Sequence, residues 1–255
     1  MQDRYAGDVG DFGKFSLLKS LFDRASDCLG VVWYLFPDET HNDDGKYTKY
    51  IEKQEFQSCD PDLINKLSNV LSGERSVYAL ENNNILKTNT VYYSGKLDFQ
   101  LIYLTQKKSD IETRLSKRQE WLKNAIKTVK LCNIVFLDPD NGLEINSCKK
   151  MSLMKSGKYA YYSEIKKLFE GKDACVIYHH LNRNKKHKEQ IESRVKDLRE
   201  KIDSTGKIFA LRYKPYSPRV YFIISKKAVE KQLKDKIQRF MNGPCCKFWD
   251  NYFEG

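Results

Sequence analysis

Three short, almost continuously apolar runs constrain the fold of this chain more than any other feature. They cover Leu29–Phe36, Asn133–Leu137 and Ala174–Tyr178. Runs of this length are typical of strands that are buried on both faces, as in a parallel sheet. Charged segments with helical patterns, such as Ile111–Val129 and Lys185–Lys201, lie between or after them. Strands that alternate with helices predict an α/β fold.

The C-terminal part shows a different pattern. Two predicted strands, Lys207–Tyr213 and Val220–Ser225, are joined by a short loop, which favours an antiparallel pair. A final helix is predicted over Ala228–Phe240, ahead of an aromatic tail. We therefore predict one α/β domain over residues 1–255. Its sheet is doubly wound, mostly parallel and Rossmann-like, with an antiparallel C-terminal strand.

Shorter segments complete the predicted order of elements. Helical spacing marks Phe15–Phe22 and Pro61–Leu71, and Asp60 is a suitable cap for the second of these helices. Short strands are predicted over Ser76–Leu80 and Thr90–Tyr93. Residues 82–109 follow no clear periodicity, so an insertion is expected near them.

Composition and charge narrow the class of protein. The 255 residues include 45 Lys and Arg against 34 Asp and Glu, a net charge of +11 that favours an anionic partner such as nucleic acid. Sixteen Tyr, thirteen Phe and three Trp are too many for a disordered chain. No apolar run reaches the roughly 20 residues of a membrane span. Seven scattered cysteines without a CxxC pair predict a reduced, cytoplasmic protein without a zinc site.

Three polar clusters follow the three apolar runs. They are Pro37–Gly45, Asp138–Glu144 and His179–Arg183. In open α/β sheets, ligands bind beyond the carboxyl ends of the strands, so these clusters are the first candidates for a site.

The cluster Asp138–Glu144, with sequence DPDNGLE, is the sharpest of the three. Pro139 restricts its own backbone and that of Asp138, so this carboxylate is held at a rigid position. Asp140 and Glu144 add two further carboxylates. Oxygen ligands of this kind suit Mg²⁺ or Mn²⁺, so Asp138, Asp140 and Glu144 are candidate metal ligands.

The N-terminal segment Arg4–Lys14 is the second strong feature. It carries Gly7, Gly10 and Gly13 at a three-residue spacing, each near an acidic or aromatic residue. Such glycines predict a loop shaped for close backbone approach. It is not a phosphate-binding loop of the Walker A type, because the GK[ST] ending is absent.

Basic residues gather near the C-terminal hairpin and after the third apolar run. Basic side chains interleaved with aromatics, such as Tyr213 and Tyr216, can follow a nucleic-acid strand by charge and stacking. The candidate nucleic-acid contacts are Arg183, Arg212, Lys214 and Arg219.

The order of these segments resembles the adenine-amine methyltransferases of large-subunit ribosomal RNA. Tyr5-Ala6-Gly7-Asp8 resembles the aromatic-Ala-Gly-Asn segment with which that family helps to hold S-adenosylmethionine, and Asp138-Pro139 stands where the family has DPPY. The resemblance implies a methyltransferase-like fold and S-adenosylmethionine as cofactor. The implied cofactor-binding residues are Tyr5, Gly7, Asp8, Lys14, Asp38 and Glu81. The implied catalytic residues are Asp138, Pro139, Asp140 and Asn141.

Two departures from that family stand in the DPPY region. Asp140 replaces the second proline and Asn141 replaces the aromatic residue that stacks on the target base. An adjacent Asp-Asn also resembles the magnesium site of catechol-type O-methyltransferases. The pair of motifs DRYxGDxGDFGK and LDPDNGLE more closely resembles a bacterial family without an assigned activity.

Three functions follow from these observations. The first is a methyltransferase-like enzyme that acts on RNA or DNA with S-adenosylmethionine. The second is a metal-dependent nuclease or phosphodiesterase that uses the DPDNGLE carboxylates together with His179 and His180. The third is a non-enzymatic nucleic-acid-binding protein that uses the charged helix Arg183–Lys201 as a phosphate-facing surface.

Overall fold

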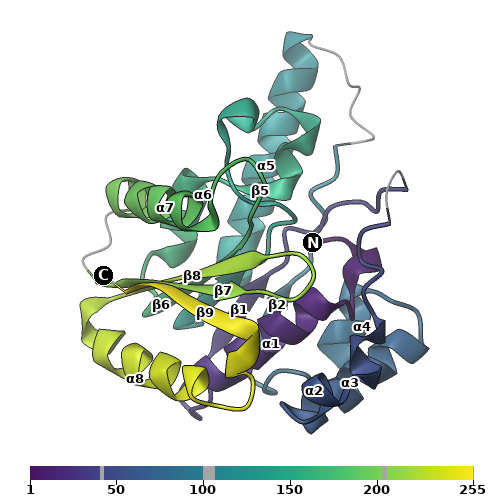
Figure 1. Ribbon diagram of the computed structural model, residues 1–255. Helices are drawn as coiled ribbons and strands as arrows, with labels where there is room; N and C mark the ends of the chain where they lie inside the picture. The colour runs from purple at the N-terminus through teal and green to yellow at the C-terminus, as the bar shows by residue number, and fades with distance from the viewer. Residues whose placement is uncertain (41–42, 100–106, 203–205, 255) are drawn as a thin grey trace.

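A computed structural model describes residues 1–40, 43–99, 107–202 and 206–254. Seven strands form one twisted sheet in the order β2-β1-β3-β6-β8-β7-β9 (Figure 1). Their bounds are β1 Leu29–Val32, β2 Val91–Tyr93, β3 Ile134–Leu137, β6 Ala174–His180, β7 Ile208–Tyr213, β8 Arg219–Ser225 and β9 Trp249–Glu254. A second, two-stranded sheet pairs β4 (Gly142–Leu143) with β5 (Tyr159–Ala160).

Strand directions confirm the predicted fold class. Strands β2, β1, β3 and β6 run parallel, while β8 pairs antiparallel with both β6 and β7. The chain passes from β1 outward to β2 and then back across β1 to β3, so the winding direction changes between β1 and β3. All four residues of β1 and all four of β3 are buried, which explains their unbroken apolar sequence.

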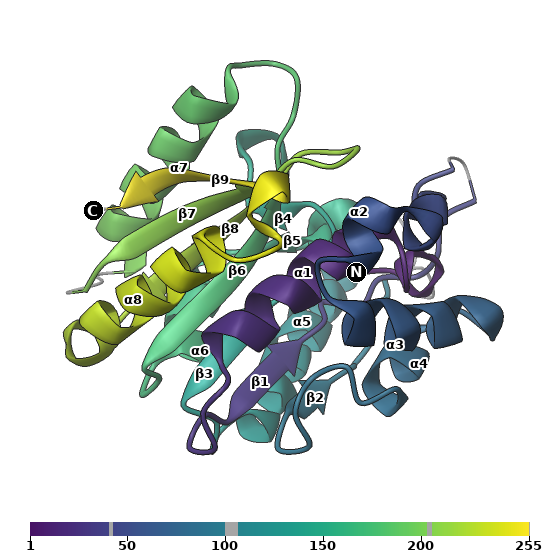
Figure 2. The same cartoon turned by 60° about the horizontal axis from the view of Figure 1, so that its bottom comes forward.

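Helices cover both faces of this sheet (Figures 1 and 2). Helices α1 (Val9–Leu21) and α8 (Glu230–Met241) pack on one face and share its apolar core. Helices α5 (Lys108–Thr128), α6 (Tyr162–Phe169) and α7 (His187–Ile202) enclose a separate core on the opposite face. The short helices α2 (Gln54–Gln57), α3 (Pro61–Ser72) and α4 (Val77–Asn82) lie beside α1 (Figure 2). No helix in the described ranges is long and apolar enough to cross a membrane.

Helix-capping residues give one correct and one wrong prediction of local structure. The Asp60 side chain accepts a hydrogen bond from the Leu63 amide and starts α3, as predicted. The strand predicted over Ser76–Leu80 is wrong, because this segment forms α4. Ser76 caps that helix through the Ala79 amide, and only Val77 and Leu80 are buried, at the i, i+3 spacing of a helix face.

Two segments form the edges of the main sheet, and one of them, β2, confirms the strand predicted over Thr90–Tyr93. The C-terminal aromatic tail forms the edge strand β9, which pairs antiparallel with β7. Strand β2 lies within the expected insertion, residues 82–109, yet it supplies the opposite edge of the main sheet. Residues 100–106 of that stretch lie outside the described residues.

Candidate active site

A cavity of about 340 Å³ lies beyond the carboxyl ends of β1, β3 and β6. This is the point at which the winding of the sheet reverses, where open α/β sheets bind their ligands. The volume is within the range of small-molecule and cofactor sites. Five chain segments supply the walls: Met1–Lys14, Asp44–Tyr47, Asp138–Asn141, Tyr178–Arg183 and Tyr216–Arg219.

Helix α1 forms one wall and corrects the predicted glycine loop. The helix begins at Val9, where the Asp8 side chain accepts hydrogen bonds from the amides of Gly10 (2.7 Å) and Asp11 (3.3 Å). Gly10 and Gly13 are therefore helical. They serve close packing, because a Cβ at Gly13 would lie 2.8 Å from the ring of Tyr213.

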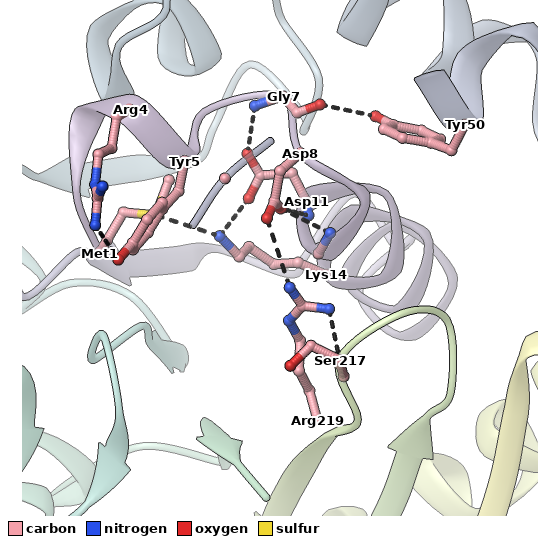
Figure 3. Close-up of polar contacts among 12 residues, drawn as sticks. Met1, Arg4, Tyr5, Gly7, Asp8, Asp11, Lys14, Tyr50, Ser217 and Arg219 are labelled. Atoms are coloured by element: carbon pink, nitrogen blue, oxygen red, sulfur yellow. Dashed lines mark hydrogen bonds and ion pairs between the residues drawn. The ribbon is translucent and has the colours of Figure 1, made fainter. Parts of the chain in front are cut away.

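A buried ion triad stands at the base of the cavity. The Lys14 ammonium lies 2.6 Å from Oδ1 of Asp11 and 2.7 Å from Oδ2 of Asp138. Asp11 also accepts a hydrogen bond of 2.8 Å from the Gly7 amide (Figure 3). Oδ2 of Asp138 is buried, and the Lys14 ammonium is its charged partner. All three side chains are at most 4% exposed.

The triad has one cation for two carboxylates, and its pKa values reflect this imbalance. Burial raises the pKa of Asp138 and of Asp11, and the attraction of Lys14 offsets the rise only in part. Burial alone would lower the pKa of Lys14, but the two carboxylates outweigh it and raise that pKa. Lys14 is therefore a fixed cation, and the carboxylate pair is the part of the triad that takes up a proton.

Arg219 links the hairpin of β7 and β8 to the start of α1. Its guanidinium lies 3.5 Å from Oδ2 of Asp8 and donates a hydrogen bond of 2.9 Å to the Ser217 carbonyl (Figure 3). A Cβ at Gly10 would lie 2.9 Å from this guanidinium, so the glycine makes the approach possible. Arg219 is 7% exposed, and it lines the cavity as a buried, paired cation.

Asp140 belongs to a second polar network beside the triad. Its Oδ2 accepts a hydrogen bond of 2.8 Å from the side-chain amide Nε2 of Gln2 and lies 3.3 Å from the Lys158 ammonium. Lys158 also pairs with Glu39, and its carbonyl accepts a hydrogen bond of 2.9 Å from the Asn141 amide. Lys158 thus supports the DPDN loop from outside the cavity.

The structure gathers more than half of the predicted site residues around this one cavity. Those that line it are Tyr5, Asp8, Lys14, Asp138, Pro139, Asp140, Asn141, Arg183 and Arg219. Gly7 lies just behind the wall, where its amide supports Asp11. Asp38 is also outside the lining, and it accepts a hydrogen bond from the Arg4 amide. His41 and Asn42, in the polar loop after the first predicted strand, lie outside the described residues.

His179 is placed differently from the prediction, and its neighbour takes the expected position. Successive residues of a strand point to opposite faces, so on β6 Tyr178 and His180 line the cavity and His179 does not. Nδ1 of His179 accepts a hydrogen bond of 3.0 Å from the Leu143 amide. Burial lowers the pKa of His179 well below its ordinary value, which fits a neutral structural acceptor.

Of the three predicted metal ligands, Asp138 and Asp140 line the cavity and Glu144 does not. Glu144 lies outside the cavity lining, on the side of the sheet where the Tyr162 amide, Lys201 and Arg194 are its neighbours. In the part of the chain that the structure describes, no three His, Cys, Asp or Glu side chains form a group that could hold a metal ion. Glu81 is also elsewhere, since its carboxylate accepts a hydrogen bond of 2.8 Å from the Trp33 indole.

The predicted basic cluster is divided between two faces. Arg219 lines the cavity, whereas Arg212 is outside it, paired with Asp250 and 2.8 Å from Nδ1 of His187. Lys214 lies 3.4 Å from the same Asp250 carboxylate. Tyr213 is fully buried. Of this hairpin, Tyr216, Ser217 and Arg219 line the cavity.

Helix α7, the third candidate contact surface, pairs its charges along its own length. Oppositely charged residues four positions apart approach each other at Lys188–Glu192, Lys196–Glu200 and Asp197–Lys201. This arrangement is typical of a solvated helix face.

Sequence reasoning missed several residues that the fold brings to the cavity. Asp11 was detectable, because it is three residues before Lys14 and shares a helix face with it once α1 is extended back through its glycines. His180 is one of the two histidines predicted beside the carboxylates, and the alternation of side chains along β6 brings it, and not His179, to the cavity. Tyr47 carried no local signal, because its place depends on a long loop. Comparisons with protein families and with curated proteins find no match for this chain.

Proposed function

We propose that this chain is a methyltransferase-like enzyme that acts on nucleic acid with S-adenosylmethionine. One observation carries the proposal. The two segments on which the resemblance rests, Tyr5–Lys14 and Asp138–Asn141, are more than a hundred residues apart in sequence and line the same cavity. That cavity is at the reversal point of a doubly wound sheet, where such folds bind nucleotide-like ligands.

The chemistry of the lining suits S-adenosylmethionine. Carboxylates outnumber Lys and Arg side chains around the cavity, and this favours a ligand that carries a sulfonium and an ammonium charge. The lining carboxylates are Asp8, Asp11, Asp44, Asp138 and Asp140, against Lys14, Arg183 and Arg219. Oδ2 of Asp138 is paired with the Lys14 ammonium, and a carboxylate oxygen can accept a further hydrogen bond from a donor group of a ligand. Tyr5 and Gly45 offer an aromatic ring and a close backbone beside it.

The chain's own residues divide the work of the reaction. S-adenosylmethionine supplies an electrophilic methyl group when it is bound. Asp138 accepts a hydrogen bond from the target amine, as the resemblance implies, and Lys14 keeps this carboxylate in place from behind. Desolvation and the charge of Arg219 lower the pKa of His180, so its neutral imidazole can accept the proton that the amine releases.

The net charge of +11 supports a polyanionic substrate. Arg183 is an exposed cation of the cavity lining, where a phosphate of the substrate backbone can reach it. The buried Arg219 contributes to the wall instead, because Asp8 and Ser217 already occupy its guanidinium.

The proposal is tested first by binding. Isothermal titration with S-adenosylmethionine and with S-adenosylhomocysteine should give saturable binding to the full chain, and Lys14→Met should abolish it. Transfer of a radiolabelled methyl group to total RNA and to genomic DNA then tests catalysis. If neither compound binds at millimolar concentration, the proposal fails.

A matched pair of variants separates the site from the rest of the DPDNGLE motif. Asp138→Asn replaces the carboxylate in the cavity with a neutral amide and should lower methyl transfer by at least about 100-fold, in line with the loss of a positioned catalytic group. Glu144→Gln changes a carboxylate of the same motif outside the cavity and should leave transfer within twofold. Equal loss in both variants would place the chemistry elsewhere.

A further inference from the structure

Two exposed tyrosines pack against each other at the cavity, with their rings tilted. Tyr47 follows β1 by a long loop, whereas Tyr216 lies in the turn between β7 and β8, and both line the cavity. Their ring centroids are 4.6 Å apart, with an angle of 32° between the planes. Tyr47 is 40% exposed and Tyr216 is 45% exposed, so much of both rings faces solvent.

Both tyrosines are attached to the start of α1. The carbonyl of Tyr47 accepts a hydrogen bond of 3.0 Å from the Val9 amide. The turn that carries Tyr216 is fixed by Arg219. The Arg219 guanidinium donates a hydrogen bond to the Ser217 carbonyl and forms an ion pair with Asp8. Tyr216 itself has φ +60°, a left-handed conformation that a bulky residue rarely adopts. The two tyrosines therefore belong to distant segments that are both fixed by hydrogen bonds and an ion pair to the start of α1.

Cations flank the two rings. The Lys53 ammonium lies 5.3 Å from the Tyr216 centroid, and the Lys46 ammonium lies 5.9 Å from the Tyr47 centroid. Both lysines are exposed. Arg183 adds a third exposed cation to the same cavity lining. Aromatic faces with cations around them match the alternation of bases and phosphates along a nucleic-acid strand.

We propose that Tyr47 and Tyr216 form a stacking platform for an unpaired base of a single-stranded nucleic acid at the cavity. This inference rests on the proposed function, and it adds that the substrate presents an unpaired base. A base within a duplex is stacked on both sides and cannot offer a face to the platform. The platform supplies an aromatic surface on a different segment from Asn141, which replaces the aromatic residue of the DPPY motif.

The adenine of the cofactor is the other source of a planar ring, and the cations argue against it. S-adenosylmethionine carries no phosphate, and its single carboxylate is at the end of the molecule away from the adenine, so an adenine on the two tyrosines would bring no anionic group to Lys46 and Lys53. A nucleic-acid strand places a phosphate on each side of every base. Each lysine that contacts a phosphate should contribute about −0.7 to the slope of log affinity against log salt for a single strand.

The test measures two affinities for each variant of the full chain. Fluorescence anisotropy gives binding of a labelled mixed-sequence RNA and DNA strand of about 12 nucleotides, each also as a duplex. Isothermal titration gives binding of S-adenosylhomocysteine. The variants are Tyr47→Ala, Tyr216→Ala and Tyr216→Phe, with Tyr78→Ala as the matched control. Tyr78 is 72% exposed on α4 and does not line the cavity.

We expect Tyr47→Ala and Tyr216→Ala to weaken single-strand binding by about 5- to 100-fold. Tyr216→Phe should retain it, because the ring provides the stacking. Tyr78→Ala should change nothing, and all four variants should bind S-adenosylhomocysteine within twofold of the wild type. The wild type should bind the single strand more tightly than the duplex.

Some outcomes would refute the platform and leave the proposed function standing. Another would refute the proposed function and leave the platform to be decided. Loss of S-adenosylhomocysteine binding in Tyr216→Ala with unchanged oligonucleotide binding would assign the platform to the cofactor. Equal oligonucleotide binding by all variants, tighter binding of the duplex, or no oligonucleotide binding by the wild type would refute the platform. Failure of the wild type to bind S-adenosylhomocysteine would refute the proposed function instead, while the oligonucleotide measurements would still decide the platform.

Discussion

Arg219 and Arg212 occupy one hairpin, yet they experience opposite surroundings. Arg219, on β8, is 7% exposed and pairs with Asp8 at the cavity. Arg212, on the neighbouring β7, pairs with Asp250 in a more exposed network. The strands pair so that Arg219 is opposite Tyr213, one residue beyond Arg212. A single step along a strand therefore moves a cation from the cavity to the opposite face of the sheet, where α7 lies and which we call the outer face.

The carboxylates of the two regions also titrate in opposite directions. In the cavity, burial raises the pKa of Asp138 and Asp11, so their folded forms favour the proton and their contribution to stability falls as pH rises. On the outer face, burial tends to raise the pKa of Asp250, but Arg212 and Lys214 outweigh it and lower that pKa. The contribution of Asp250 is present above its unfolded pKa and is lost as pH falls through the folded one.

The largest loss of stability is expected when Lys14, the cation of the buried triad, is replaced. Lys14→Met leaves Asp11 and Asp138 buried without their shared partner and should lower the free energy of unfolding by about 3–5 kcal/mol near pH 8. Urea denaturation measures this loss. A loss below about 1 kcal/mol would show that the triad is not isolated from water.

The pH dependence of stability in Lys14→Met tests the direction in which the cavity carboxylates titrate. Without Lys14, the pKa values of the two carboxylates should rise further, because the largest opposing influence on the effect of burial is then lost. Since protonation neutralises them, Lys14→Met should recover part of its stability when the pH is lowered from about 8 to about 5. Urea curves at both pH values test this, and a variant that instead becomes less stable at the lower pH would contradict it.

Arg219→Met should have the next largest effect. It removes the partner of Asp8 and the support of the Ser217 carbonyl, and we expect a loss of about 2–3 kcal/mol. Because this support also fixes the Tyr216 turn, oligonucleotide affinity should fall in the same variant. The measurements are urea denaturation and fluorescence anisotropy, and unchanged affinity would separate Arg219 from the platform.

The two adjacent histidines of β6 give a comparison within one strand. His179→Leu keeps volume but removes the acceptor of the Leu143 amide, which should cost about 1–3 kcal/mol. His180→Ala changes a cavity-lining residue and should affect methyl transfer more than stability. Thermal denaturation together with methyl-transfer rates distinguishes them, and the opposite pattern would restore His179 as the functional residue.

The smallest effect belongs to the outer face. Arg212→Met breaks a pair whose Asp250 side chain is 34% exposed, so we expect a loss of about 0.2–1 kcal/mol. Oligonucleotide binding should remain within twofold of the wild type, because Arg212 does not line the cavity. A marked loss of affinity would show that the nucleic acid extends over the outer face.

Local sequence signals predicted much of the fold where the relevant physics is local. Asp60 capped α3 as expected, because a carboxylate followed by proline satisfies the first amides of a helix whatever surrounds it. The segment Ser76–Leu80 was assigned wrongly, since a stretch of five residues fits strand and helix equally and its burial decided the outcome. The aromatic tail became β9 only because β7 offered an unpaired edge.

The candidate site was predictable in its segments and not in all of its residues. Asp138 followed a buried strand, and the general position of ligands in α/β sheets placed it correctly at the cavity. Glu144 is six residues further along the same motif, and the small sheet of β4 and β5 carries it to a different environment. Spacing along the chain could not reveal this, because the turn at Gly142 changes the direction of the backbone.

By itself, the sequence determined the class of sheet and the end of it that carries polar groups. Apolar runs, caps and loop lengths express forces that act within a few residues, so they can be recognised without a structure. Only the tertiary structure decided that Lys14 joins Asp11 to Asp138, that His180 faces the cavity in place of His179, and that Tyr47 meets Tyr216. These choices depend on side-chain direction, which reverses at each residue of a strand, and on contacts between segments far apart in the chain.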